Sequence, residues 1–475
     1  MEHTTSAPTW RWSTAVAPAV ASLRSLPLPL LVPLAVSALA FVVTVLRRLL
    51  RRQRPVYLLN YSCHLPDAER QVNLEVCEYL GLRCRRYSDD TADFLRLIYR
   101  KSGLGQETYA PPFIFSGKFE KTLAFAVQEA EEGLFAAVGQ LLAKSDVKPA
   151  EIGVLVVACS MYSPAPSLAS MLVRRFKMRA DVKSYSVAGT GCSAGTVGVD
   201  TAARSLRARR AKGGSYALVV VTENTSLNWY FGENKHMLVT NCIFRVGSAA
   251  ALLTDVPARR ADAKYELVRT LRTHHGADDA AYNAAVQMED EEGNVGVALT
   301  KDLVRVAGAG LRQHIATLGP RVLPVTEMLR YAWRVSRAYA AGSPKQAAAE
   351  VPDFQKAFDH MCIHSGGKAV IDAVARLMGF GPDVVEPARA TLHRFGNTSS
   401  SLVFYELAYF EAKRRVRKGD RLWMLAFGTG FKACSNVWRA LRDAAPDADN
   451  PWNGCVHRYP VPLPPPSKTH KPAPA

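Results

Sequence analysis

Residues 152–224 contain the pattern that decides the fold. They read IGVLVVAC (152–159), a glycine turn AGTGCSAG (188–195), a helix-like run TVGVDTAARSLRARR (196–210) and YALVVVTEN (216–224). The two apolar runs are short and rich in β-branched residues, which is typical of strands that are buried on both faces. The same character recurs in AAALLT (249–254), HMCIH (360–364) and LWMLAF (422–427). Strands that alternate with amphipathic helices predict an α/β fold.

A second copy of this pattern follows along the chain. Residues 356–430 overlay residues 151–225 without a gap, although few positions are identical. The strand that ends at Cys159 falls on the strand that ends at His364, and the turn at Cys192 falls on the turn at Asn397. This repeat predicts two halves related by a pseudo-two-fold axis. It nominates Cys192, Asn397 and His364 as one cluster near that axis.

The residue types of this cluster suit acyl transfer. A nucleophilic cysteine needs thiolate character, which the N-terminus of a helix favours, and Cys192 stands at the start of one. Free cysteines are more often buried structural residues, and the glycine-rich setting is what favours a nucleophile here. His364 and Asn397 can both donate to the oxygen of an enolate, although a strand-end histidine and a helix-capping asparagine are ordinary structural roles.

A second oxyanion hole can be predicted from backbone groups. The N–H groups of Cys192 and of the loop that ends at Gly430 are the candidates for it. Downstream of the first half, AVQMEDEEGNVGVAL (285–299) predicts a β-hairpin around Gly293.

An apolar run near the N-terminus predicts a membrane anchor. Residues 26–46 carry no charge, and 21 residues are enough for one transmembrane helix. Five arginines follow within residues 47–54, where a signal peptide would instead have a small-residue cleavage site. Only two arginines precede the run, against the five that follow it. The positive-inside rule therefore predicts that the body, which follows the run, lies in the cytosol.

Charge and cysteine content exclude two other classes of protein. The formal net charge is +18, but residues 1–54 hold seven arginines against Glu2, and no nucleic-acid-binding motif appears elsewhere. We therefore expect no nucleic-acid partner. The nine cysteines form no CxxC pair, which excludes a disulfide framework or a zinc site and indicates a reducing compartment.

Several longer motifs resemble the plant 3-ketoacyl-CoA synthases of very-long-chain fatty acid elongation, over residues 54–460. These motifs are RPVYLLNYSC (54–63), SGLGQETY (102–109), TGCSAG (190–195), NCIFRVGSAAALL (241–253), RTHHGADD (272–279), CIHSGGKAVID (362–372), LHRFGNTSSSLVFYELAY (392–409), FGTGFK (427–432) and NPWNGCVHRYP (450–460). The resemblance implies a thiolase-like fold with α-β-α-β-α layers. It also implies a long-chain acyl-CoA primer, malonyl-CoA as extender, no metal or cofactor, and an endoplasmic reticulum membrane location.

The resemblance also assigns roles to residues. Cys192 would be the acylated nucleophile, with His364 and Asn397 promoting decarboxylation and condensation. His274, His360 and His393 would be further histidines important for activity, although from the residues alone they read as structural. The chain departs from the family in two places: SVAGTG (186–191) replaces a frequent Gly-Gly-Met-Gly run, and one apolar N-terminal span stands where two are usual.

The predicted organisation has four parts. They are an anchor over residues 1–54, a first half over 55–257 with Cys192, a second half over 258–449 with His364 and Asn397, and a proline-rich tail over 450–475 that is extended or disordered. We expect a homodimer that works with other elongase enzymes. The alternatives are a degradative thiolase, a soluble polyketide-type condensing enzyme, and a catalytically idle, membrane-bound partner subunit of an elongase complex.

Overall fold

Strand β1 (Tyr57–Cys63) forms the middle of a nine-stranded mixed sheet, whose order is β11-β12-β13-β8-β1-β7-β6-β4-β5. The computed structural model describes residues 54–209 and 214–461. The other strands of this sheet are β4 (Ile152–Ala158), β5 (Lys183–Val187), β6 (Tyr216–Thr222), β7 (Ser248–Thr254), β8 (Tyr265–His274), β11 (His360–Ile363), β12 (Arg421–Gly428) and β13 (Lys432–Ala440). All five strands predicted from apolar runs are confirmed.

The strand pairing repeats itself on the two sides of β1. On one side β4 runs parallel to β6, and β6 runs antiparallel to β7. On the other side β11 runs parallel to β12, and β12 runs antiparallel to β13. The repeated order agrees with the internal repeat of the sequence, and the division at residues 257–258 falls in the connection between β7 and β8.

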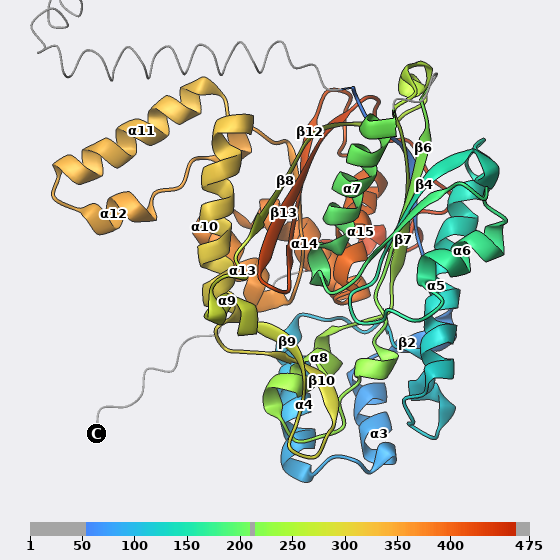
Figure 1. Ribbon diagram of the computed structural model, residues 1–475. Helices are drawn as coiled ribbons and strands as arrows, with labels where there is room; N and C mark the ends of the chain where they lie inside the picture. The colour runs from blue at the N-terminus through green and yellow to red at the C-terminus, as the bar shows by residue number, and fades with distance from the viewer. Residues whose placement is uncertain (1–53, 210–213, 462–475) are drawn as a thin grey trace, which may run out of the picture. The chain divides into compact units, whose positions relative to one another are not determined.

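Two helices lie between the two groups of strands. They are α7 (Ala194–Arg209) and α15 (Leu402–Ala412), which Figure 1 shows side by side between β8–β13 and β4–β6–β7. Small buried residues let α7 approach β6 closely, and a Cβ at Gly198 would lie 2.9 Å from Val219. Nearly every residue of α15 is buried, because the helix has strands on both sides.

Helices also cover the two outer faces. One face packs against α5 (Leu123–Ala143) and α6 (Leu168–Phe176). The other packs against α10 (Leu303–Val322), α13 (Lys368–Met378) and α14 (Pro382–Phe395). The layers are therefore α-β-α-β-α, as expected for a thiolase-like fold (Figure 1).

A smaller group of elements gathers at one end of these layers, at the bottom of Figure 1. It contains α3 (Leu74–Cys84), α4 (Asp89–Ser102), α8 (Lys235–Ile243) and the antiparallel hairpin of β9 (Ala285–Glu289) and β10 (Val295–Leu299). This hairpin confirms the prediction, with Gly293 at a φ of +80° in its turn. The short pair β2 (Gln71–Val72) and β3 (Thr108–Tyr109) adjoins it. The described residues also form the helices α9 (Asp279–Asn283), α11 (Val325–Ala340) and α12 (Pro344–Ala349).

The predicted membrane anchor and the predicted tail lie at the two ends of the chain. The predicted anchor lies outside the described residues, and within residues 54–209 and 214–461 no helix is long and apolar enough to cross a membrane. At the other end, the expectation of an extended tail from residue 450 is wrong for residues 450–461. Trp452 there is fully buried, and its indole Nε1 donates to Tyr405 O at 2.8 Å.

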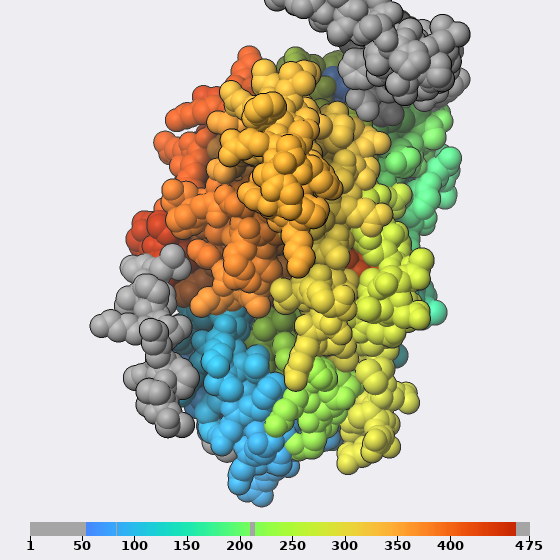
Figure 2. Space-filling view, turned by 90° about the vertical axis from the view of Figure 1, so that its left-hand side faces the viewer, coloured from blue at the N-terminus to red at the C-terminus, as the bar shows by residue number. Residues whose placement is uncertain are grey.

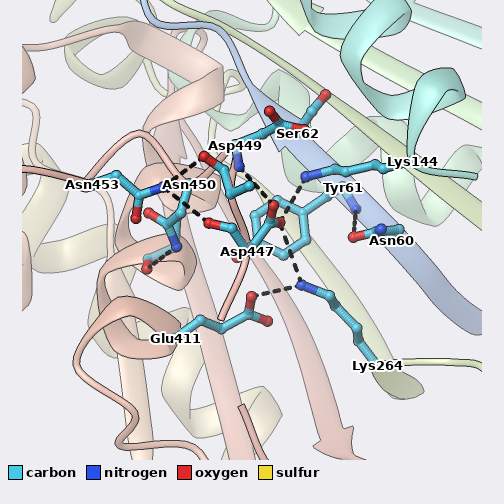
Figure 3. A network of polar contacts seen from close by, with 12 residues as sticks. Asn60, Tyr61, Ser62, Lys144, Lys264, Glu411, Asp447, Asp449, Asn450 and Asn453 are labelled. Carbon is cyan, nitrogen blue, oxygen red and sulfur yellow. Dashed lines mark hydrogen bonds and ion pairs between the residues drawn. The ribbon is translucent and has the colours of Figure 1, made fainter. Parts of the chain in front are cut away.

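Polar contacts also fix this C-terminal segment to the rest of the fold. Figure 3 shows Asp447 between two cations, and its carboxylate lies 2.7 Å from Lys144 Nζ of the segment after α5. Lys264, just before β8, forms an ion pair with Glu411 of α15 at 2.8 Å. Asn450 donates to Ala408 O at 3.0 Å. Asp447 and Asn450 therefore join the C-terminal segment to the segment after α5 and to α15.

Candidate active site

Cys192 lies in a tight turn whose first residue has a left-handed backbone conformation that favours glycine. The turn η4 (Gly191–Ser193) leads directly into α7, and Gly191 has a φ of +60°. A Cβ on Gly191 would lie 2.5 Å from the backbone nitrogen of Thr429, in the loop between β12 and β13. The loop from the second half is thus pressed directly against the cysteine turn from the first half.

The three residues of the predicted cluster line one cavity of about 350 Å³. It is lined by Cys192, by His364 directly after β11, and by Asn397 between α14 and the turn η8 (Ser399–Ser401). Gly430, predicted for the oxyanion hole, lines the same cavity with Thr429. The structure therefore places the residues of the two helix starts at one site, as the repeat predicts.

The surroundings of Cys192 act on the ionisation of its thiol in two directions. Burial raises the pKa of Cys192 to about 12, although hydrogen bonding to Ser399 and Asn397 acts in the opposite direction. Desolvation therefore disfavours the thiolate, whereas the position at the start of α7 favours it. The thiolate character of Cys192 stays a prediction, and the thiol proton needs an acceptor when the sulfur attacks.

A hydroxyl and a carboxylate next to Cys192 provide a path for that proton. Ser399 Oγ lies 3.5 Å from Cys192 Sγ and donates to Glu223 Oε2 at 2.7 Å. A hydroxyl has one hydrogen, so with this hydrogen directed at Glu223 its oxygen can accept the thiol proton. Burial raises the pKa of Glu223, while the N–H groups of Ser160 and Met161 donate to Glu223 Oε1 at 3.0 and 2.8 Å.

The sequence interpretation missed Glu223 and Ser399. Glu223 follows directly on the apolar run of β6, and Ser399 lies two residues after Asn397 in the turn. A carboxylate at the end of a buried strand is costly unless it is hydrogen-bonded, and this cost is the signal that could have identified Glu223.

His364 is a neutral hydrogen-bond donor in this site. Burial lowers the pKa of His364 to about 3, so the imidazole is uncharged near neutral pH. Its Nδ1 is buried and has no hydrogen-bond partner among the described residues. A buried orphan lone pair costs less than a buried orphan N–H, so the proton belongs on Nε2. The Nε2–H group is then the one available to a substrate oxygen.

The amide of Asn397 is oriented by its neighbours. Its Oδ1 accepts the backbone N–H of Ser399 at 2.8 Å, which leaves Nδ2 as the donor, and Nδ2 lies 3.4 Å from Gly366 O. Its backbone bonds to the end of α8: Asn397 N donates to Ile243 O, and Arg245 N donates to Asn397 O, both at 3.0 Å. Two donors from the second half, His364 and Asn397, therefore face the same cavity as the thiol.

The other three predicted histidines do not line this cavity. His360 starts β11 at the end away from His364, and its Nε2 lies 2.8 Å from Asp420. His393 lies on α14, and its Nδ1 is 3.0 Å from the hydroxyl of Tyr459. His274 ends β8 on the surface, where it accepts the N–H of Gly276 at 3.0 Å. Each contact is structural, so any effect on activity would be transmitted through position.

Two family matches cover most of the chain. Residues 48–339 match the family described as FAE1/Type III polyketide synthase-like protein. Residues 355–440 match the family described as 3-oxoacyl-[acyl-carrier-protein (ACP)] synthase III C terminal. Cys192 lies in the first match, and the two donors His364 and Asn397 lie in the second.

Solved structures share the fold at low sequence identity. A fungal type III polyketide synthase, ORAS, superposes with a TM-score of 0.64 at 17% identity, over 81% of this chain and 99% of that one. The type III polyketide synthase domain of Steely1 from Dictyostelium gives 0.63 at 18% identity, over 82% of this chain and 99% of that domain. The α-β-α-β-α architecture is therefore the thiolase-like, type III polyketide synthase-like fold.

Sequence relatives are much more similar. 3-ketoacyl-CoA synthase 17 of Arabidopsis thaliana is 47% identical over 410 residues, which are 86% of this chain and 83% of the relative. 3-ketoacyl-CoA synthase 16 of the same plant is 46% identical over 420 residues, which are 87% and 84% of the two chains. The chain therefore belongs to the FAE1/type III polyketide synthase-like family, and within it to the 3-ketoacyl-CoA synthases.

Proposed function

We propose that the protein condenses a long-chain acyl-CoA with malonyl-CoA to give 3-oxoacyl-CoA, CO₂ and free CoA. This is the first step of very-long-chain fatty acid elongation. The observation that supports it is the single cavity in which Cys192 faces the donors His364 and Asn397. A partly buried thiol and two preorganised donors suit a thioester acceptor and an enolate nucleophile.

In the first step the acyl group moves from CoA to Cys192. The thiol proton passes to Ser399 Oγ while the Ser399 proton moves to Glu223, and the sulfur attacks the thioester carbon. The bond to CoA breaks, and CoA leaves as a thiolate that takes a proton from solvent, while the proton from Cys192 stays on Glu223 and returns to the sulfur when condensation frees it. The N–H groups of Cys192 and Gly430 are our candidates to bind the oxyanion of the tetrahedral intermediate.

In the second step malonyl-CoA loses CO₂. The electron pair of the broken C–C bond forms an enolate, whose oxygen accepts from His364 Nε2–H and Asn397 Nδ2–H. The enolate carbon attacks the acyl-Cys192 carbonyl, forming a C–C bond and expelling the thiolate, which takes up a proton. Because His364 is uncharged, it stabilises the enolate by hydrogen bonding and leaves the enolate carbon unprotonated.

We also propose where the protein works and with what. The apolar run at residues 26–46 would anchor it in the endoplasmic reticulum membrane, with the body in the cytosol as a homodimer beside other elongase enzymes. Long acyl chains partition into bilayers, so an anchored enzyme meets its primer where it is concentrated. Protease protection of intact microsomes tests the orientation: a C-terminal epitope that resists protease until detergent is added would contradict it.

The activity is tested with protein purified from microsomes and given a long-chain acyl-CoA and labelled malonyl-CoA. We expect labelled 3-oxoacyl-CoA, released CO₂ and an acyl group on the peptide that contains Cys192. Cys192→Ala should abolish both the acyl-enzyme and the product, because the site offers no second thiol at that position. A wild-type protein that forms neither would instead support the alternative of an idle elongase subunit.

A further inference from the structure

Helix α11 stands out from the layers beside α10, together with the short helix α12 (Figure 1). We propose that its outward side lies on the surface of a membrane that contains anionic lipids, as a second attachment besides the predicted anchor. We name this side the α11 face; it consists of Val325, Leu329, Arg330, Trp333 and Arg337. The inference rests on the proposed membrane location and adds the surface through which the body would meet the bilayer.

The apolar side of α11 is turned outward. Val325, Leu329 and Trp333 follow one another at intervals of four residues, which places them on one side of the helix. They are 74%, 66% and 68% exposed. A surface helix of a globular protein normally turns its apolar side to the core. This helix does the opposite, and it leaves three large apolar side chains together in solvent.

Polar contacts on the opposite side of α11 fix this orientation. Glu327 is 2% exposed and accepts the backbone N–H of Asp353 at 2.9 Å. Arg334 lies 3.5 Å from Glu327 and 2.9 Å from Glu350. Removing these partners would leave a buried carboxylate unpaired, which is costly. The helix therefore keeps its charged side inward and the α11 face outward.

The α11 face carries positive charge. Arg330 and Arg337 are exposed and lie three residues before and four residues after Trp333, so both are its neighbours on the helix. Among residues 54–209 and 214–461 neither arginine has an ion pair. Glu327 is the only acidic residue of α11, and it is buried. Leucine and tryptophan bordered by arginine are typical of helices that lie in the headgroup region, where anionic lipids attract the basic side chains.

The sheet places α11 at the end where the chain enters the body. Tyr57 of β1 pairs with Glu266 of β8, which pairs in turn with Arg439 of β13. Arg439 pairs with Arg421 of β12, whose Nη1 donates to Val322 O at 3.1 Å. Val322 ends α10, three residues before α11 begins. Because neighbouring strands are about 4.8 Å apart, the row from β1 to β12 covers only about 14 Å.

This placement suits a body held by the predicted anchor. The charge-free run ends at residue 46, and the eight residues 47–54 can span at most about 30 Å. The anchor would therefore hold the start of β1 close to the bilayer, and α11 begins at the same end of the strands. Figure 2 looks onto the side from which α11 and α12 project, and shows their yellow-orange segment in the upper half and the blue segment with α3 and α4 in the lower half.

Leu123 provides a matched control for the α11 face. It is 61% exposed at the start of α5, similar to Leu329. Lys121, two residues earlier, donates to Val295 O of β10 at 3.2 Å, in the group of elements at the other end of the layers (Figure 1). Leu123→Glu therefore introduces the same change on an equally exposed helix residue, away from the proposed membrane contact.

The experiment uses the full chain reconstituted into vesicles that contain a trace of lipid with a photoreactive diazirine in its acyl chain. The vesicles are made of phosphatidylcholine alone or of phosphatidylcholine mixed with phosphatidylserine. After irradiation the labelled peptides are mapped by mass spectrometry. We expect label within residues 325–340 of the wild type, and more of it in the vesicles that contain phosphatidylserine. Label within residues 26–46 reads the proposed anchor separately.

Two double variants separate the apolar and the charged parts of the α11 face. Leu329→Glu/Trp333→Glu should lower the label on residues 325–340 at least about tenfold, because two large apolar side chains no longer enter the bilayer. The helix should persist, since glutamate is a good helix former and position 333 lies four residues before Arg337. Arg330→Gln/Arg337→Gln should remove the preference for phosphatidylserine, and Leu123→Glu should label like the wild type.

Several results would overturn the inference, whether or not residues 26–46 are labelled. They are no label within residues 325–340 of the wild type, equal label in both kinds of vesicle, and equal label in the wild type and Leu329→Glu/Trp333→Glu. A smaller mass of this variant in detergent would show that the face covers a second copy, which also contradicts it. Condensation in detergent should be equal in all variants, since no residue of α11 lines the cavity with Cys192. Its absence in the wild type would refute the proposed function and leave the labelling result standing.

Discussion

Replacing Gly191 by alanine tests whether the close approach of the two halves positions the reacting groups. The new Cβ would lie 2.5 Å from the nitrogen of Thr429, whereas an ordinary contact begins at 3.4 Å, so the turn and the loop must separate by 3.4 − 2.5 = 0.9 Å. A displacement of about 1 Å near the reacting atoms costs about a hundredfold in rate. Overpacking costs about 1–3 kcal/mol of stability, which a typical domain survives.

Gly189→Ala is the matched control for this prediction. Gly189 has a φ of +63°, close to the +60° of Gly191, so both substitutions carry the same backbone strain of about 1–2 kcal/mol. A Cβ at Gly189 would meet no described atom within 4 Å, so only Gly191→Ala must move the β12–β13 loop.

The assay is kcat/KM for 3-oxoacyl-CoA formation, with thermal unfolding measured on the same samples. We expect a loss of about a hundredfold for Gly191→Ala and less than about threefold for Gly189→Ala. Equal activities for the two variants, at similar melting temperatures, would refute the argument that the clash with Thr429 displaces the site.

Three further predictions concern titration and charge. Only the ionised carboxylate of Glu223 accepts the proton through Ser399, so the rate of acyl-Cys192 formation in the wild type should rise with pH. Glu223→Gln should slow this step by at least about a hundredfold and remove the rise with pH. Rapid-quench measurement of the acyl-enzyme checks both effects. Asn397→Asp should let acyl-enzyme accumulate while product formation falls at least about a hundredfold, since the new charge repels the enolate; a variant with neither acyl-enzyme nor product would contradict this division of roles. Burial lowers the pKa of His314 from 6.5 to about 4 in the folded protein. As the pH drops between these values, His314 is protonated in the unfolded protein but not in the folded one, so the free energy of unfolding falls. In His314→Gln this fall should be shallower by about 1.4 kcal/mol per pH unit in denaturant titrations, and an unchanged slope would show that His314 is not the group responsible.

Much of the framework could be predicted from local pattern. Buried strands such as β4 and β6 are apolar over their whole length, and the glycine in the β9–β10 turn marks the hairpin. The internal repeat nominated Cys192, His364 and Asn397 together, because equivalent strand ends and helix starts in two similar halves converge near their common axis. These features depend on residues that are close together in the sequence or related by one constant offset.

The chemical state of the site could not be predicted in the same way. The pKa of Cys192 is set by how much protein surrounds the thiol, and that depends on elements as distant in sequence as Ser399 and the β12–β13 loop. The contact between Ser399 and Glu223 joins residues 176 positions apart, with no constant pattern to reveal it. Residues 450–461 are similar: their composition reads as a tail, and only the tertiary structure shows where Trp452 is buried.

The central position of β1 has a consequence for how the chain is made. β1 is synthesised before the rest of the nine-stranded sheet, yet its partners β7 and β8 begin only at Ser248 and Tyr265. At about 5–20 residues per second, roughly 190 further residues take about 10–40 s, during which an apolar strand has both edges unpaired. We expect nascent chains arrested before Ser248 to bind holding chaperones through residues 57–63, and chains arrested after β8 has left the ribosome to release them. Synthesis rate and chaperone supply, more than final stability, should then limit how much of this protein a cell accumulates.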